Sequence, residues 1–240
     1  MKILLPASIV STFFITNVLF IYFYADNIYG HHSFRQSQTA LAVHWMINGT
    51  QTIDYLPILG YPWRLPMEFP LYQLIVAQLS IITDGSHLYI ARYLNVCFTI
   101  CTILLVSSNV RQPRTFMAIS ATSPLTFYYS TSYLIEAFCI LLLFTNIIFL
   151  CQYRRTRSIK YLILTVLIFG IIALQKVTYA IPLLLVYVVI EAADLRASRS
   201  NIYGLLVKTG LIILAVLPIV IWQMHSTEIK GLGYLTKMEV

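Results

Sequence analysis

The chain has 240 residues, of which 59% are hydrophobic and only 10% are charged, and it carries a net charge of +7. Soluble domains are about 45–50% apolar and about 25% charged, so this composition excludes an ordinary soluble domain. The basic residues lie in short clusters between apolar runs, which membrane topology explains without a nucleic-acid partner. We therefore expect an all-α polytopic membrane protein.

The first apolar run, residues 3–24, has no charged residue and is long enough to cross a bilayer. A secretory signal has an apolar core of about 7–15 residues, so this run predicts an uncleaved anchor. After a loop over residues 25–87, six more spans are expected: Leu88–Val110, Thr115–Tyr133, Ile135–Gln152, Tyr161–Leu174, Val177–Ala193 and Leu205–Met224. We predict about seven spans and a tail (225–240) in a single transmembrane domain, 1–240. Pro124 interrupts the second of the six.

The basic residues predict the orientation of these spans. One set of connections and the N-terminus carry ten of the sixteen: Lys2, Arg111, Arg114, Arg154, Arg155, Arg157, Lys160, Arg196, Arg199 and Lys208. The other side has six, spread over more sequence: Arg35, Arg64, Arg92, Lys176, Lys230 and Lys237. The positive-inside rule therefore predicts a cytoplasmic N-terminus and an outer 25–87 loop.

The outer loop contains the signals of two surface helices. Ser33 and Gln36 have the spacing of a capping box, and Asn48-Gly49 is a helix stop, so the first helix is predicted at about 34–47. Its polar strip carries Arg35, Gln38 and Thr39, and its apolar strip carries Phe34, Leu41 and Trp45. Three prolines in YPWRLPMEFP forbid a regular helix, and Pro70 suits the start of a second one, 70–82. Both helices are expected to lie along the membrane surface.

Two glutamates are the candidate catalytic residues. Glu68 follows the proline-rich segment, and Glu136 begins an apolar run at the predicted outer face. If both reach one cavity, one could deprotonate an acceptor hydroxyl while the other helps to place the substrate. The alternatives are a surface Glu68 paired with Arg64 and a solvated Glu136 that stabilises a helix start.

Three cations at the predicted outer face could bind a phosphate group: Arg35, Arg64 and Lys176. The alternative for Lys176 is a lysine at the membrane interface, with its charge in water. His31, His32 and His44 have no acidic ligand at a fixed spacing, so no metal site is predicted, although a divalent metal stays an option. The four cysteines lie in or at the end of apolar runs and are expected to pack.

The layout and several segments resemble the GT-C superfamily of membrane glycosyltransferases, of the mannosyltransferase and aminoarabinose-transferase type. The segments are HHSFRQSQTALAVHWMINGT, PWRLPMEFPLYQLI and SPLTFYYSTSYLIEAF. The resemblance implies an enzyme of the cell envelope that transfers a sugar from a polyprenyl-phosphate donor to a lipid, glycan or protein acceptor. It implies inversion at the sugar, a carboxylate base (Glu68 or Glu136), no cofactor, and a bacterial inner membrane as the location.

The resemblance also suggests which residues bind the substrate. They are His32, Arg35, Gln36, Gln38, Trp63, Arg64 and Lys176, and the aromatic residues Tyr61, Trp45, Tyr128 and Tyr129 would stack on sugar or line a lipid groove. The sequence departs from the family in two ways. No carboxylate lies between Asp26 and Asp54, and Arg35 or Gln38 stands where relatives have their first acid. Relatives also carry further spans, so the resemblance implies a fragment, a truncated frame or a minimal version of the family.

Two other functions compete with this one. A catalytically inactive GT-C-like protein that binds or transports polyprenyl lipids would explain the missing first acid. An unrelated small transporter would be expected to show an internal repeat with broken helices, and the sequence has no such repeat.

Overall fold

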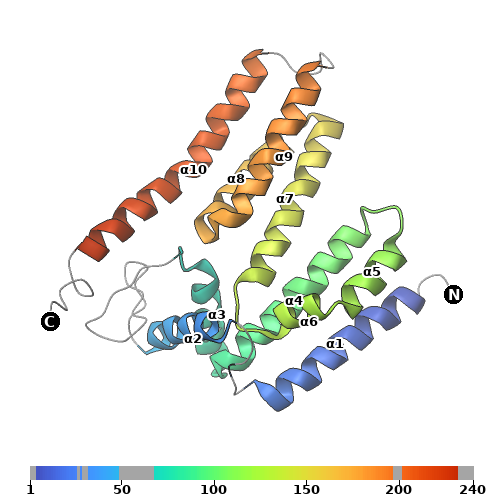
Figure 1. Ribbon diagram of the computed structural model, residues 1–240, viewed down its shortest axis with the longest axis vertical. Helices are drawn as coiled ribbons and strands as arrows, with labels where there is room; N and C mark the ends of the chain where they lie inside the picture. Colours follow the sequence, from blue (N-terminus) through green and yellow to red (C-terminus); the bar gives the residue numbers. More distant parts are fainter. Residues whose placement is uncertain (1–3, 26–27, 29–31, 49–67, 197–201, 232–240) are drawn as a thin grey trace. The chain divides into compact units, whose positions relative to one another are not determined.

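The computed structural model describes residues 4–25, 28, 32–48, 68–196 and 202–231, and the regular structure in these ranges is entirely α-helical (Figure 1). The helices are α1 (Leu4–Tyr24), α2 (Ser33–Ile47), α3 (Leu71–Thr83), α4 (His87–Ser107), α5 (Pro113–Thr122), α6 (Pro124–Thr131), α7 (Glu136–Thr156), α8 (Ile159–Gln175), α9 (Val177–Arg196) and α10 (Ile202–Gly231). They form two compact units, Met1–Leu141 with Ile229–Val240, and Leu142–Glu228. The all-helical fold class is confirmed. The division does not test the prediction of a single transmembrane domain.

Within the described residues, five helices are long and apolar enough to cross a bilayer: α1, α4, α7, α9 and α10. Many of their large apolar side chains are exposed, such as Val189 of α9, at 68%. Exposed apolar surface of this extent is unusual in soluble proteins and normal where lipid is the solvent. Five such helices indicate a multi-pass integral membrane protein.

Two of the seven predicted spans are not among these five helices. The region Thr115–Tyr133 forms two short helices, α5 and α6, because Ser123 is extended and Pro124 cannot continue the helix of the preceding residues. The Ser123 hydroxyl then caps α6 by accepting a hydrogen bond from the Thr126 N–H at 3.4 Å. The region Tyr161–Leu174 is α8, an apolar helix of 17 residues, so spanning by α8 stays a prediction.

The two helices expected in the 25–87 loop form as α2 and α3, within one residue of the predicted bounds at each end, and their place along the membrane surface stays a prediction. Asn48 ends α2, and its backbone N–H bonds the His44 carbonyl. The predicted capping box is wrong: His32 is the residue before the first turn, and no side chain caps it. Gln36 has a different partner, described below.

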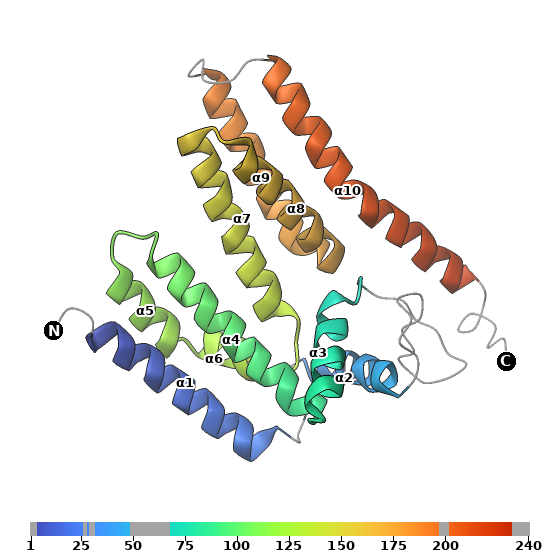
Figure 2. The ribbon, with the colours of Figure 1, turned by 180° about the vertical axis from the view of Figure 1, so that it is seen from behind.

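In the first unit, α1 lies beside α4 and α5, as both ribbon views show (Figure 2). Phe13, Ile103 and Met117 bring these three helices into one apolar cluster. Two polar contacts also hold α1 to α6 and to α4. Ser130 donates a hydrogen bond to the Asn17 side chain at 2.5 Å, and the buried Arg92 donates to the Tyr24 carbonyl at 3.1 Å.

In the second unit, Asn146 links three helices. Its side-chain nitrogen donates to the Thr165 carbonyl of α8 at 2.7 Å, and its oxygen accepts from the Tyr187 hydroxyl of α9 at 2.9 Å. The helix α10 approaches α8 closely at Gly170, where an added Cβ would lie 3.0 Å from the Ala215 carbonyl oxygen. Small residues and interhelical hydrogen bonds of this kind are how helices associate in a bilayer.

Candidate functional site

In the first unit, the first turn of α2 is held against the connection between α6 and α7. The buried Gln36 side-chain oxygen accepts a hydrogen bond from the Tyr133 backbone N–H at 2.9 Å. The His32 backbone N–H donates to the Tyr128 hydroxyl at 3.4 Å. Each contact joins residues almost a hundred positions apart, so α2 and the segment that leads into α7 belong to one site.

An ion pair lies beside this contact. The Arg35 guanidinium donates to a Glu68 carboxylate oxygen at 2.7 Å, and their side chains are 36% and 13% exposed. The pairing of Glu68 with Arg35 ties the residue just ahead of α3 to α2. The alternative pairing of Glu68 with Arg64 falls outside the described residues.

Glu136 is the first residue of α7 and is 8% exposed. The three residues before it, Tyr133 to Ile135, are buried as well. A carboxylate in the first turn is stabilised by the positive end of the helix dipole. Glu136 therefore begins a helix, as the alternative for this residue predicts, but it is buried rather than solvated.

Beneath these residues is a buried polar cluster that the sequence analysis missed: Tyr72, Arg92 and Asn95. Asn95 donates to the carbonyls of Ser132 and Leu134, both at 2.8 Å, and so supports the connection that Gln36 contacts from the other side. The Tyr72 hydroxyl donates to the Ala91 carbonyl at 3.1 Å. The cluster therefore anchors the segment that leads into Glu136.

The electrostatics of Tyr72 connect the cluster to Glu136. Burial raises the pKa of the Tyr72 hydroxyl well above its ordinary range. A hydrogen bond with Asn95 and the charge of Arg92 oppose the shift, and the charge of Glu136 adds to it. Tyr72 is thus a neutral hydrogen-bond donor at any physiological pH, within electrostatic reach of both Glu136 and Arg92.

A signal for Arg92 was present in the sequence. It lies inside an apolar run, and ionisable residues there are costly and usually face a partner or a cavity. The sequence-based prediction treats Arg92 only as a charge that indicates orientation. Tyr72 gave no comparable signal, because tyrosine is common at membrane interfaces. Asn95 lies inside the same apolar run as Arg92, where an uncharged amide is a weaker signal than a guanidinium.

Two histidines lie near the same connection. His87 is 3.2 Å from the Tyr133 hydroxyl through its Nδ1 atom, and its ring centroid is 6.1 Å from that of His44. No group of three or more histidine, cysteine or acidic side chains that could hold a metal occurs among the described residues. His31 is outside them.

The remaining candidate residues are spread over the chain. Gln38 is half-buried on α2, and His32 is exposed beside Tyr128. Lys176 lies in the second unit, between α8 and α9, with its ammonium 5.8 Å from the Tyr179 ring centroid. Trp63 and Arg64 fall outside the described residues. Joint action of Lys176 with Glu136 stays a prediction.

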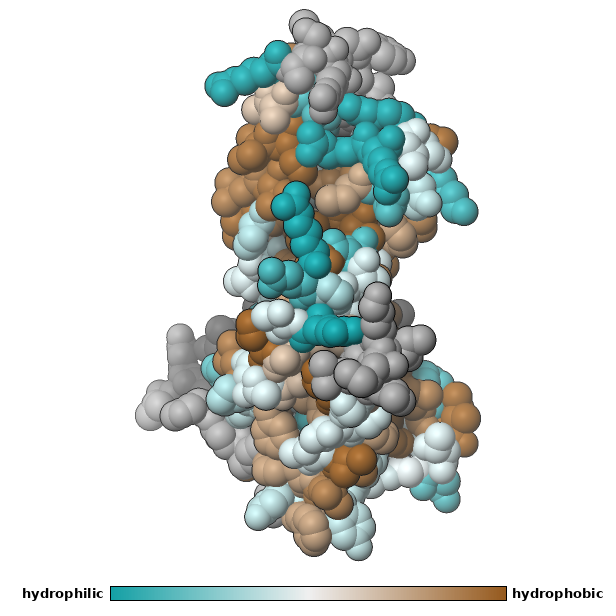
Figure 3. All heavy atoms as spheres, turned by 90° about the vertical axis from the view of Figure 1, so that its right-hand side faces the viewer, coloured by the Kyte–Doolittle hydropathy of each residue, from teal (hydrophilic) through white to brown (hydrophobic). Residues whose placement is uncertain are grey.

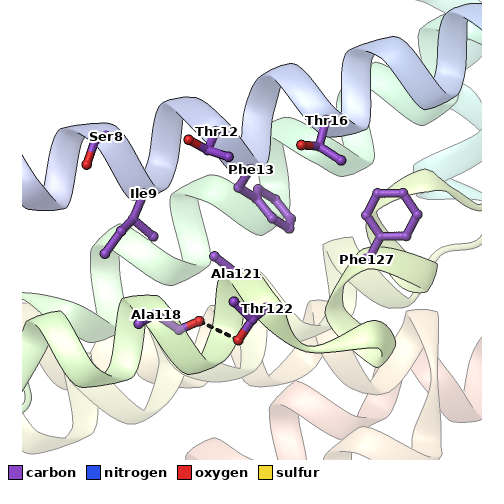
Figure 4. Close-up of a pocket in the computed structure, with 9 residues that line it drawn as sticks. All are labelled: Ser8, Ile9, Thr12, Phe13, Thr16, Ala118, Ala121, Thr122 and Phe127. Atoms are coloured by element: carbon purple, nitrogen blue, oxygen red, sulfur yellow. Dashed lines mark hydrogen bonds between the residues drawn. The ribbon is translucent and has the colours of Figure 1, made fainter.

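A cavity of about 280 Å³ lies elsewhere in the first unit, between α1 and the α5–α6 pair (Figure 4). Three hydroxyl residues spaced four apart on α1, namely Ser8, Thr12 and Thr16, line one side of it. Its other lining is mostly apolar, and the Thr122 hydroxyl opposite is bonded to the Ala118 carbonyl at 2.8 Å. No predicted site residue lines this cavity.

Fold and site together define a multi-pass helical membrane protein with a buried polar site where α2 and the segment before α3 meet the start of a candidate span. No protein-family model matches the chain, and no curated protein or solved structure matches it.

Proposed function

We propose that the chain is an integral-membrane glycosyltransferase that takes a sugar from a polyprenyl-phosphate donor. The observation that carries the proposal is the partly buried Arg35–Glu68 pair, one residue away from the Gln36 contact to the segment ending in Glu136. In this arrangement Arg35 can bind a phosphate group, and the buried carboxylate of Glu136 can accept a proton. The proposal puts the site on the outer face of a bacterial inner membrane.

In the proposed reaction, an acceptor hydroxyl of a lipid, glycan or protein attacks the anomeric carbon of the donor sugar. The bond from that carbon to the phosphate oxygen breaks, and the configuration inverts. Polyprenyl phosphate leaves with the bonding electrons, while a carboxylate takes the proton of the attacking hydroxyl. The guanidinium of Arg35 would stabilise the charge that develops on the phosphate, with Arg64 and Lys176 as further candidates for the same task.

The ion pair suggests different roles for the two glutamates. The carboxylate of Glu68 already accepts a charge-assisted hydrogen bond from Arg35 at 2.7 Å, so it is suited to orient that guanidinium. This leaves Glu136 as the better candidate for the base. Tyr72 and Asn95 would be positioning residues, since they support the segment before Glu136 or its surroundings.

The proposal is tested by turnover of purified protein in lipid nanodiscs. The donors are polyprenyl-phosphate-linked glucose, mannose and aminoarabinose, and release of polyprenyl phosphate is measured. Glu136→Gln should lower kcat roughly 100-fold or more, the usual loss for a general base. Glu68→Gln should mainly raise KM for the donor, because it frees Arg35 from its fixed position.

The matched control is Glu228→Gln, which removes an exposed carboxylate from α10 in the second unit. It should turn over donor at the wild-type rate. Equal turnover by the wild type, Glu136→Gln and Glu68→Gln would contradict the acid–base roles.

A second function is favoured by one observation. The helix α2 carries no acid: Arg35 or Gln38 stands where the family resemblance implies one, and Arg35 is paired with Glu68. A protein that binds or moves polyprenyl lipids without catalysis fits this arrangement. Tight donor binding without turnover of any of the three donors would favour this alternative.

A further inference from the structure

The second unit has a strongly basic end that the proposed function does not use. The α7–α8 turn, taken as residues 154–160, includes the end of α7 and the start of α8. It holds Arg154, Arg155, Arg157 and Lys160, and Arg196 ends α9 nearby in the fold. The acidic residues on the last turns of α9 are Glu191 and Asp194. Five basic residues against two acidic ones leave this end positive. Figure 3 shows hydrophilic side chains gathered at this end of the unit, next to hydrophobic surface.

Asp194 organises the basic turn. One of its carboxylate oxygens accepts from the Arg154 guanidinium at 2.8 Å, and the other accepts from the Arg157 guanidinium at 3.3 Å. Asp194 itself is only 2% exposed, whereas the two arginine side chains are 36% and 40% exposed. The carboxylate is therefore enclosed beneath two guanidinium groups whose outer sides face solvent.

The backbone of Arg157 supports this arrangement. Its φ of 56° is left-handed, a conformation usual for glycine at the end of a helix and uncommon for arginine. Its N–H closes α7 by donating to the Tyr153 carbonyl at 2.7 Å, and its guanidinium lies 5.9 Å from the Tyr153 ring centroid. The left-handed turn places an arginine side chain against Asp194, which a glycine could not supply.

The place of the cluster indicates its partner. Both α7 and α9 are candidate spans, and the cluster lies where they end, at Thr156 and Arg196. The ends of spanning helices lie at the level of the lipid headgroups. Each guanidinium has five N–H donors in a planar fork, and Asp194 occupies one from each arginine, so the remaining donors can face a phosphate.

We propose that the α7–α8 turn binds the phosphate group of an anionic phospholipid, through Arg154, Arg155, Arg157 and Lys160. Asp194 is the positioning residue, because it fixes the direction of two of the four cations. The site is separate from the one around Glu136, and its existence does not depend on glycosyl transfer.

The test is native mass spectrometry of the full chain in detergent, titrated with phosphatidylglycerol or phosphatidylcholine. The wild type should bind phosphatidylglycerol more tightly. The double variant R155Q/K160Q should lose roughly 10-fold in that preference, as expected for two basic residues at an anionic surface. The matched control R111Q/R114Q removes two exposed charges, one in the α4–α5 connection and one in the first turn of α5, and should keep the preference. Equal losses in both double variants would overturn the proposal.

A competition arm separates the lipid from a free anion. Inorganic phosphate at millimolar concentration should leave bound phosphatidylglycerol in place, because the glycerol and acyl chains add contacts that phosphate lacks. Complete displacement by inorganic phosphate would overturn the assignment to a lipid.

Asp194→Asn tests positioning against simple charge. The substitution makes the turn more positive, so an unorganised basic patch would bind phosphatidylglycerol more tightly. Positioning predicts weaker binding despite the added positive charge, while Glu228→Gln, with the same change of charge, should not weaken it. Tighter binding by Asp194→Asn would overturn the positioning role, and the R155Q/K160Q comparison decides the site if Asp194→Asn does not fold.

Discussion

At the scale of single residues, Asn95 shows how one amide can hold a site together. Its nitrogen serves two backbone carbonyls, those of Ser132 and Leu134, in a connection that has no helical hydrogen bonds of its own to satisfy them. A buried carbonyl without a donor costs about 1–3 kcal/mol. Asn95 is therefore important to stability as well as to the position of Glu136.

We expect Asn95→Leu to lower the stability of the protein by roughly 1–3 kcal/mol, because both carbonyls lose their donor while remaining buried. The measurement is the thermal unfolding midpoint in detergent. A loss of stability of this size should lower the midpoint by several degrees. Asn109→Leu is the control. Asn109 is exposed and bonds only within its own turn, to Leu105 and Ser108, so water can replace those contacts. Equal midpoints for the two variants would contradict the anchoring role.

The residue scale is also where the sequence was least informative. The pairing of Ser33 with Gln36 was predicted from spacing alone, but Gln36 reaches Tyr133 instead, a partner that no local pattern reveals. The same holds for Arg35 and Glu68: each was identified as a candidate, but their contact needs the fold. Residue type and local spacing indicate which interactions a side chain can make, whereas long-range packing determines which partner it contacts.

At the scale of helices, the sequence was a good guide wherever apolar runs end at charged residues or prolines. The surface helices were located within one residue, because Asn48 and Pro70 are strong local signals. The region around Pro124 was misassigned as one span because its hydropathy is continuous while its backbone is not. Hydropathy describes how readily side chains transfer from water to lipid, and it takes no account of the backbone N–H that a proline lacks.

Gly170 gives a prediction at this scale. Gly170→Ala should destabilise the second unit by roughly 1–3 kcal/mol, because the new Cβ would lie 3.0 Å from the Ala215 carbonyl oxygen and α8 and α10 would have to separate. Gly210→Ala is the matched control, with nothing within 4 Å of its Cβ, and should be neutral or slightly stabilising. Thermal unfolding midpoints in detergent report both. A Gly170→Ala midpoint at or above that of Gly210→Ala would contradict the close contact.

At the scale of the whole molecule, the five candidate spans agree with the composition of the chain, and the direction of insertion stays a prediction from its basic residues. The distribution of basic residues acts on orientation when the chain is inserted into the membrane of a cell.

The orientation is tested by labelling single cysteines in intact cells with a membrane-impermeant maleimide, after replacement of the four native cysteines. Ser33→Cys, on the exposed side of α2, should react from outside, because the 25–87 loop is predicted there. Thr156→Cys, exposed at the end of α7, should react only after the cells are permeabilised. Labelling in the opposite order would show an inverted orientation and would remove the outer-face site from the proposal.

The contact between Gln36 and Tyr133 has a consequence for how the chain is made. The two residues are 97 positions apart, so the ribosome must extend the chain well past the end of α2 before the contact can form. Until then, only the hydrogen bonds within α2 and its exposed Phe34 can stabilise the helix. An exposed aromatic side chain of this kind can insert into a membrane surface. The polar site is thus completed only after the chain has been made past Tyr133, and contacts between such distant parts of a chain form slowly.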